Sequence, residues 1–292
     1  MRKDEGHIIV EHKHRIWYQL LGEEGVPLLV LHGGPGAGHD YLNSLQKLSD
    51  KNPVVFYDQL GCGKSDIPDD VSLWSIDRFV DEVDIVRDAL NLDQIHLLGH
   101  SWGGWLAIEY LLTRNTDGVK SLVLASTSAS ASQFISELSR LKRDLPETIY
   151  DAIQKHELNG SYEHPEYLEA IEFLYQRHFC RLEEWPPALQ RTGDNIAASP
   201  VYETMWGKNE ALCTGNLKHW NRAEYLTEIS VPTLITVGKY DELTPNCAAT
   251  LNQKIPESTL AVFQNSAHVP HIEEESKYLR TLSGFFSTIE AT

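Results

Sequence analysis

The chain has 292 residues, which is enough for one large domain or for a core with a sizeable insertion. Its hydrophobic fraction is 41% and its charged fraction is 23%, a composition that favours a folded globular protein over a disordered one. The formal net charge of -17 leaves no basic surplus to meet nucleic-acid phosphates or anionic lipids, so we expect neither partner.

Short apolar runs alternate with amphipathic stretches along the first 127 residues. The apolar runs predict strands at 7–12, 15–21, 27–32, 53–58, 94–99 and 119–125. The stretches 75–91 and 102–114 space their apolar residues with the period of a helix. Strands that alternate with helices in this way predict a mostly parallel sheet with helices on both faces.

The middle of the chain, 128–230, has few strand-like runs and several helical stretches. Prolines interrupt these stretches at Pro146, Pro165, Pro186, Pro187 and Pro200. Because the segment is too long for a loop, we predict an inserted helical cap. Further on, we predict strands at 231–238 and 258–264 and a closing helix at 273–290. The chain then divides into a core, 1–127 and 231–292, and the cap, 128–230.

The strongest motif is Gly99-His100-Ser101-Trp102-Gly103-Gly104, which directly follows an apolar run and directly precedes a predicted helix. It fits the pattern G-x-S-x-G of a nucleophile elbow, in which a serine stands at the tip of a sharp strand-to-helix turn. Glycines are needed there because the turn is sharp and its flanks pack closely. In this context the motif predicts an α/β-hydrolase fold with Ser101 as the nucleophile.

A serine hydroxyl needs a base to take its proton, and the base needs an acid to orient it. In α/β-hydrolases the chain order is serine, acid, histidine. The first strand after the cap ends just before Asp241 and Glu242, which compete for the role of acid. His268 follows the last predicted strand and is the expected base, with His271 as its competitor nearer the closing helix. We predict a triad of Ser101, Asp241 and His268.

A second glycine-rich turn, His32-Gly33-Gly34-Pro35-Gly36, follows another predicted strand. In this fold the loop after that strand supplies one amide of the oxyanion hole, and the residue after the nucleophile supplies the other. We therefore expect the amides of Gly34 and Trp102 to hold the negative charge that develops on the substrate's carbonyl oxygen.

Other catalytic chemistries find little support in the sequence. No H-E-x-x-H motif occurs, and Cys62, Cys180, Cys213 and Cys247 show neither CxxC pairing nor the spacing of metal ligands. We expect no metal and no cofactor. Unpaired cysteines, an N-terminus without an apolar signal core and the absence of a membrane-spanning apolar run favour a cytoplasmic protein.

Several segments together resemble the proline iminopeptidases and, more narrowly, the tricorn-interacting aminopeptidase branch of that family. They are His32-Gly33-Gly34-Pro35-Gly36, Asp58-Gln59-Leu60-Gly61-Cys62-Gly63-Lys64-Ser65, the elbow motif around Ser101, and Gly238-Lys239-Tyr240-Asp241-Glu242-Leu243-Thr244-Pro245. The resemblance runs through nearly the whole chain, including the cap. It implies a serine aminopeptidase that releases an N-terminal residue, often proline, from short peptides through an acyl-enzyme.

The resemblance also implies that acidic residues hold the free amino group of the substrate. The matching positions are Glu210, in the cap, and Glu242, beside the triad acid. A free ammonium needs a partly buried carboxylate to offset its desolvation, and an anchor at this end limits cleavage to one residue. Two departures from the family, Leu60 in place of arginine and His100 in place of a small residue, favour a broader choice of first residue.

Two alternatives to a peptidase stay open. The same fold and triad would serve an amino acid amidase or another small-molecule amide or ester hydrolase. A hydrolase fold can also be reused as a non-catalytic ligand-binding protein, although a complete set of triad residues argues against that. For a peptidase or amidase, the partners are short peptides or amino acid amides with a free N-terminus. The cap aromatics Trp206 and Tyr202 are candidates to line the first-residue pocket.

Overall fold

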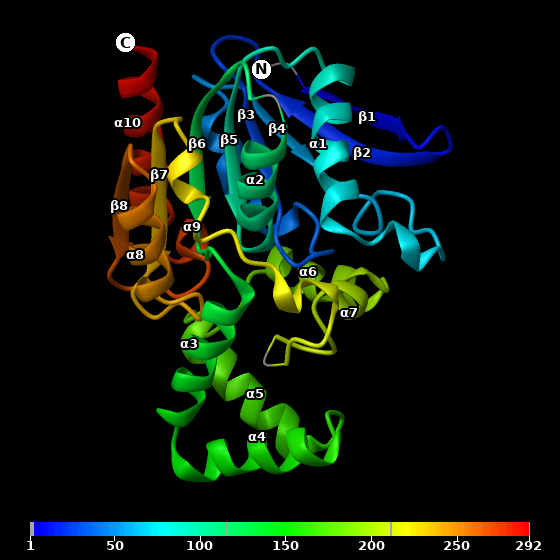
Figure 1. Ribbon diagram of the computed structural model, residues 1–292, viewed down its shortest axis with the longest axis vertical. Coiled ribbons are helices and arrows are strands. Elements are labelled where there is room, and N and C mark those ends of the chain that lie inside the picture. The colour runs from blue at the N-terminus through cyan, green and yellow to red at the C-terminus, as the bar shows by residue number, and fades with distance from the viewer. Residues whose placement is uncertain (1–2, 115, 211, 292) are drawn as a thin grey trace.

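The structure is a computed structural model that describes residues 3–114, 116–210 and 212–291 (Figure 1). Its centre is one sheet whose strands lie in the order β1-β2-β4-β3-β5-β6-β7-β8. The strands are β1 (Lys3–Val10), β2 (His14–Leu21), β3 (Leu28–Leu31), β4 (Val54–Tyr57), β5 (Ile95–His100), β6 (Val119–Ala125), β7 (Thr233–Gly238) and β8 (Ser258–Phe263). Only the pairings β1–β2 and β2–β4 are antiparallel, so the predicted mostly parallel sheet is confirmed.

The parallel strands read as continuous apolar runs because helices cover both of their faces. One face packs against α1 (Ile76–Ala89), α2 (Trp102–Thr113) and α8 (Pro245–Lys254). The other face packs against α10 (Glu275–Glu290) and the 3-10 segment η1 (Asp40–Leu48). Alternate side chains of each strand enter the two layers, with Leu29 and Leu31 on one face and Leu28 and Val30 on the other.

A helical insertion separates β6 from β7, as predicted. It contains α3 (Ala131–Arg143), α4 (Glu147–Asn159), α5 (Pro165–His178), α6 (Pro187–Ala197) and α7 (Val201–Met205), followed by the 3-10 segments η3 (Asn216–His219) and η4 (Leu226–Glu228). The prolines that interrupt the pattern stand at helix N-termini, where the missing N–H costs nothing. In Figure 1 the insertion lies below the sheet, at the end where β6 leaves it.

Several elements differ from the prediction, among them η1, for which no element was predicted. β1 already includes Lys3, because its polar side chains alternate on an exposed face instead of forming an apolar run, and the predicted end at 12 is wrong because residues 11 and 12 form a left-handed turn. The helix α8 was not predicted, since only three of its residues are buried. The closing helix is two helices, α9 (Pro270–Glu273) and α10, because Glu274 between them leaves the helical conformation.

The four cysteines are free thiols, as expected. Among the described residues, no helix combines the length and the apolar character that a bilayer span requires.

Candidate active site

Ser101 stands between β5 and α2 in a strained backbone conformation. Its φ is +55° and its ψ is -121°, a left-handed φ that a non-glycine residue adopts only when its surroundings impose it. The Ser101 amide donates to the Ala125 carbonyl oxygen at 2.9 Å, and the Thr127 hydroxyl donates to the Ser101 carbonyl oxygen at 2.8 Å. These bonds to the end of β6 and the loop after it hold the turn, which is the predicted elbow.

The glycines around Ser101 are required by close packing. A β-carbon on Gly99 would lie 2.1 Å from the carbonyl oxygen of Gly103, and one on Gly103 would lie 2.1 Å from the carbonyl oxygen of Leu31. No side chain fits at such distances. The elbow therefore depends on glycine at both flanks, which brings the start of α2 against β3.

The predicted acid and base meet at the carboxyl end of the sheet. His268 Nδ1 lies 2.8 Å from Asp241 Oδ1, and both side chains are buried. The Leu243 amide donates to the same Asp241 oxygen at 2.9 Å and fixes the carboxylate. The His268 ring packs 4.8 Å from that of His100, the residue before Ser101. Among the described residues no hydrogen bond joins Ser101 to His268, a contact that in such sites often tightens only with bound substrate.

His271, the competitor for the base, lies elsewhere. Its ring is buried against Tyr41, His100 and Tyr278, and neither ring nitrogen has a partner among the described residues. Burial and the neighbouring His268 lower the pKa of His271 to about 3. The enclosed, neutral ring of His271 contributes to packing. The carboxylate of Asp241 contacts His268 instead.

Glu242 is a buried carboxyl beside the base. Its side chain is 1% exposed, and its Oε1 lies 4.0 Å from His268 Nε2. Its Oε2 has no hydrogen-bond partner among the described residues. Burial, with the nearby charges of Glu210 and Asp241, raises the pKa of Glu242 well above its ordinary value. An unpartnered buried carboxyl of this kind is costly unless a cation joins it.

Glu210 reaches the same region from the insertion. The Tyr202 hydroxyl donates to its carboxylate, and the Trp206 indole N–H donates to its backbone oxygen at 3.2 Å. Burial raises the pKa of Glu210, although the bond from Tyr202 opposes the shift. The structure thus brings together the two glutamates that lie 32 positions apart in the sequence, one from the insertion and one from the core.

The expected oxyanion donors lie beside the nucleophile. The amide of Gly33 is already used, since it donates to the Tyr41 hydroxyl at 2.8 Å. The amides of Gly34 and Trp102 have no hydrogen-bond partner among the described residues. Gly34 has a φ of +108°, and a β-carbon there would lie 2.6 Å from the amide nitrogen of Gly36. These features fit two free donors near Ser101.

A small cavity opens onto Ser101. Its volume is about 20 Å³, room for about one water molecule. Its walls combine the nucleophile region with aromatic and acidic side chains of the insertion: Gly34, Pro35, Ser101, Trp102, Trp105, Phe134, Trp206, Glu210, Leu217 and Leu243. Trp206 therefore lines this cavity, as expected. Tyr202 is not among its lining residues and instead donates a hydrogen bond to Glu210, which is. A substrate ring can enter only when some of these side chains shift.

Comparisons with known proteins agree with the fold. The family model that matches describes the alpha/beta hydrolase fold and covers residues 26–275. The proline iminopeptidase of Heyndrickxia coagulans is 41% identical over 278 residues, which is 94% of this chain and 96% of that protein.

Two crystal structures are also similar. That of the proline iminopeptidase from Mycobacterium smegmatis has a TM-score of 0.92 and 31% identity, covering 99% of both chains. That of VinJ has a TM-score of 0.94 and 33% identity, covering 98% of this chain and 99% of that one. The chain belongs to the proline iminopeptidase family of α/β hydrolases. It is therefore an enzyme, a serine hydrolase of the aminopeptidase class.

In this family member His100, the departure before the nucleophile, has a defined place. His100 Nδ1 lies 2.8 Å from the Tyr41 hydroxyl, and His100 Nε2 lies 2.9 Å from the backbone oxygen of His268. The Tyr41 hydroxyl in turn accepts a hydrogen bond from the Gly33 amide. The chain of bonds joins the loop of the expected oxyanion hole to the loop of the base. Burial lowers the pKa of His100 well below its ordinary value, which keeps its ring neutral.

Sequence reasoning missed several side chains of this iminopeptidase site. Tyr41 and Phe134 line or support it, and Phe179 packs its ring 5.4 Å from that of His268. None of them lies in a recognisable motif. Phe134 is one of several buried apolar residues of an amphipathic helix, and only the packing of α3 against the core shows that it faces Ser101.

One group of described side chains could share a metal ion, and it lies on the insertion away from Ser101. It consists of His156, His164 and Glu166. The Glu166 carboxylate already accepts Lys155 Nζ at 2.6 Å and lies 2.9 Å from His156 Nε2. These contacts satisfy the carboxylate without a metal.

Proposed function

We propose that this enzyme releases an N-terminal proline from short peptides, with Ser101, His268 and Asp241 as its triad. Ser101 Oγ attacks the carbonyl carbon of the first residue while His268 takes the hydroxyl proton, and Asp241 orients and stabilises the imidazolium. The amides of Gly34 and Trp102 hold the oxyanion.

The second half of the reaction returns the enzyme to its starting state. His268 gives its proton to the leaving amine as the bond to the second residue breaks, which leaves an acyl-enzyme on Ser101. Water then attacks the ester, with His268 again as base, and the free amino acid departs. The scheme uses no metal and no cofactor.

The observation that carries the proposal is a pair of neighbouring carboxyl groups, of which Glu242 is buried and Glu210 is partly buried. Glu242 has an unpartnered buried oxygen, and burial raises the pKa of both carboxyl groups. A substrate ammonium placed between them would supply a cation and favour the ionised form of both groups. Since His268 lies beside Glu242, an amine held there places the first carbonyl, and no later one, at Ser101.

The free amino group is the feature to test. Rates should be measured on proline, alanine and phenylalanine arylamides, each with and without N-acetylation. We expect the free proline arylamide to be the best substrate, and acetylation to lower kcat/KM by about 100-fold or more, because a buried charge pair is lost. Ser101→Ala is the control for background hydrolysis. Equal rates on free and acetylated substrates would contradict the anchor and favour a general amide or ester hydrolase.

Two finer assignments stand as proposals beside this one. The resemblance of the motifs supports a place in the tricorn-interacting branch, which acts on short peptides. The unpaired thiols support a cytoplasmic location. Amino acid amides carry the same free ammonium as peptides, so the same site should also accept them.

A further inference from the structure

We propose that a second cavity, lined mainly by apolar side chains of the insertion, binds the residue after the cleaved bond, and that Lys208 binds the substrate's C-terminal carboxylate. The inference rests on the proposed function, because it takes Ser101 and His268 as the reacting groups. It assigns a substrate class: di- and tripeptides with an apolar second residue.

The second cavity adjoins the region of the nucleophile. It has a volume of about 250 Å³, and Glu210 lines both this cavity and the small cavity at Ser101. Phe179 also lines it, and this residue touches the base twice. Its ring lies 5.4 Å from the His268 ring, and its backbone oxygen accepts the His268 amide at 2.9 Å. The second cavity therefore lies next to the residue that packs on His268, which would give its proton to the leaving amine.

The walls of the second cavity suit an apolar side chain. Besides Phe179, they include Trp185, Leu189 and Ile196. The indole N–H of Trp185 already donates to the Cys180 backbone oxygen at 3.2 Å, so the ring offers the cavity little besides apolar surface. Burying a leucine side chain here would be favourable, whereas a glycine at the same position would gain nothing.

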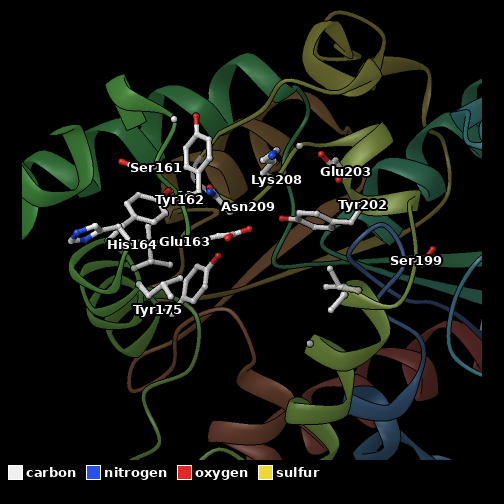
Figure 2. Close-up of a pocket in the computed structure, with 18 residues that line it drawn as sticks. Ser161, Tyr162, Glu163, His164, Tyr175, Ser199, Tyr202, Glu203, Lys208 and Asn209 are labelled. Atoms are coloured by element: carbon white, nitrogen blue, oxygen red, sulfur yellow. Dashed lines mark hydrogen bonds between the residues drawn. The ribbon is translucent and has the colours of Figure 1, made fainter. Parts of the chain in front are cut away.

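Lys208 supplies a positive charge to the second cavity. It is the only lysine or arginine among the described residues that line this cavity, and its ammonium has no partner among them. It also lines an outer cavity of about 840 Å³, around which Figure 2 shows Tyr175, Tyr202 and Lys208.

Glu163 and Glu203 line the outer cavity as well and would repel an anion. Among the described residues that line the two cavities, Lys208 is the only lysine or arginine, so a peptide carboxylate is favourable beside it. The carboxylate is the one charge that every short peptide keeps after its amine is bound, and this cation is placed to receive it.

The test compares the dipeptide Pro-Leu with its C-terminal amide, with Pro-Gly and with a proline arylamide. For wild type we expect kcat/KM on Pro-Leu to exceed that on its amide by about fivefold, the order of an exposed ion pair. It should exceed that on Pro-Gly by about tenfold, the order for a missing apolar group in a pocket. In Lys208→Glu the ratio of Pro-Leu to its amide should fall to one or below. Lys120→Glu, an equal charge change on β6, should keep the wild-type ratio.

A wild type that does not distinguish Pro-Leu from its amide, or a Lys208→Glu variant that keeps the wild-type ratio, would overturn the role of Lys208. Equal rates on Pro-Leu and Pro-Gly would overturn the apolar subsite. In each of these cases hydrolysis of the proline arylamide would still support the proposed function. A wild type inactive on the arylamide as well would overturn both.

Discussion

In the proposed function, Glu242 lowers the stability of the free protein but binds the amino group of the substrate. Ionisation of Glu242 is unfavourable because the carboxyl is buried beside Glu210 and Asp241, and the pKa of Glu242 is raised for that reason. Between the ordinary value of 4.5 and the raised value, the folded protein binds more protons than the unfolded chain. The free energy of unfolding must therefore fall as pH rises through that window. A bound ammonium reverses the balance by favouring the charged form.

The variant Glu242→Gln separates the two effects. At pH 8 we expect it to unfold at a temperature about 3 °C or more above wild type, because a neutral amide replaces an unpaired charge. We expect kcat/KM on the free proline arylamide to fall by about 100-fold, because the anchor for the amine is lost. Calorimetry and steady-state rates check both. At pH 4.5 the difference in stability should shrink, and a variant less stable than wild type at pH 8 would contradict this account.

The sequence was enough to propose the triad residues but showed few of the side chains that surround them. Ser101, Asp241 and His268 each sit at a recognisable strand end, so chain order and motif were enough to propose them. Loop position also favoured His268 over His271 as the base, and the structure supports this choice because His268 contacts Asp241 whereas His271 is enclosed. The bond between Tyr41 and His100 joins positions 59 apart, and no local pattern records such a contact.

A salt bridge ties the insertion to the core, and it joins the buried Glu109 of α2 to Arg222, whose side chain is 33% exposed. Glu109 of α2 is 2% exposed and accepts Arg222 Nε at 2.7 Å and the Trp220 indole N–H at 2.9 Å. Burial works against ionisation of Glu109, but the bonds from Arg222 and Trp220 outweigh it and lower its pKa. Both partners belong to the segment that returns from the insertion, so this carboxylate fixes the insertion to the helix that begins at the nucleophile.

Removing the cation should therefore destabilise the fold. We expect Arg222→Met to lower the free energy of unfolding at pH 7.5 by about 2 kcal/mol, because a buried carboxylate loses its charged donor. A lowered pKa means that the ion pair stabilises the fold above the ordinary carboxyl pKa and fades as pH falls through the folded value. Urea unfolding at pH 7.5 and pH 4 measures this loss, which should be smaller at pH 4.

The double variant Glu109→Gln/Arg222→Met is the matched control. It should recover part of the loss at pH 7.5, because it removes the stranded charge together with its partner. If Arg222→Met were as stable as wild type, or equally destabilised at both pH values, the ion pair would not fix the insertion.

Prediction worked best for elements with strong local signals. The buried strands of the parallel sheet are nearly continuous apolar runs, and the prolines of the insertion mark where its helices begin. The helix α8 was not predicted because only three of its residues are buried and most of its other side chains are polar. At Glu274 the backbone leaves the helical conformation, and its carboxylate accepts the Asn265 amide and the Ser266 hydroxyl, contacts that no periodicity encodes.

Core and insertion share one hydrophobic interior across the whole molecule. Trp105 of α2 stacks on Trp220 with ring centroids 4.5 Å apart and meets the edge of Trp206 at 5.8 Å. These rings belong to the same buried cluster as Leu29 and Leu31 of the central sheet. The insertion therefore does not bury its apolar surface by itself, although we predicted a chain divided into a core and a cap.

We expect the protein to unfold in a single transition, because exposing the tryptophan cluster would remove apolar packing from the core and from the insertion at the same time. Trp105→Ala should lower the free energy of unfolding by about 3–5 kcal/mol, the cost of deleting a large buried ring. It should also keep one transition, with calorimetry, far-UV circular dichroism and tryptophan fluorescence giving the same midpoint. Two transitions in wild type, with the fluorescence change preceding the loss of strand signal, would mean that the insertion melts on its own. In that case the aromatic cluster would be a contact between two units that fold independently.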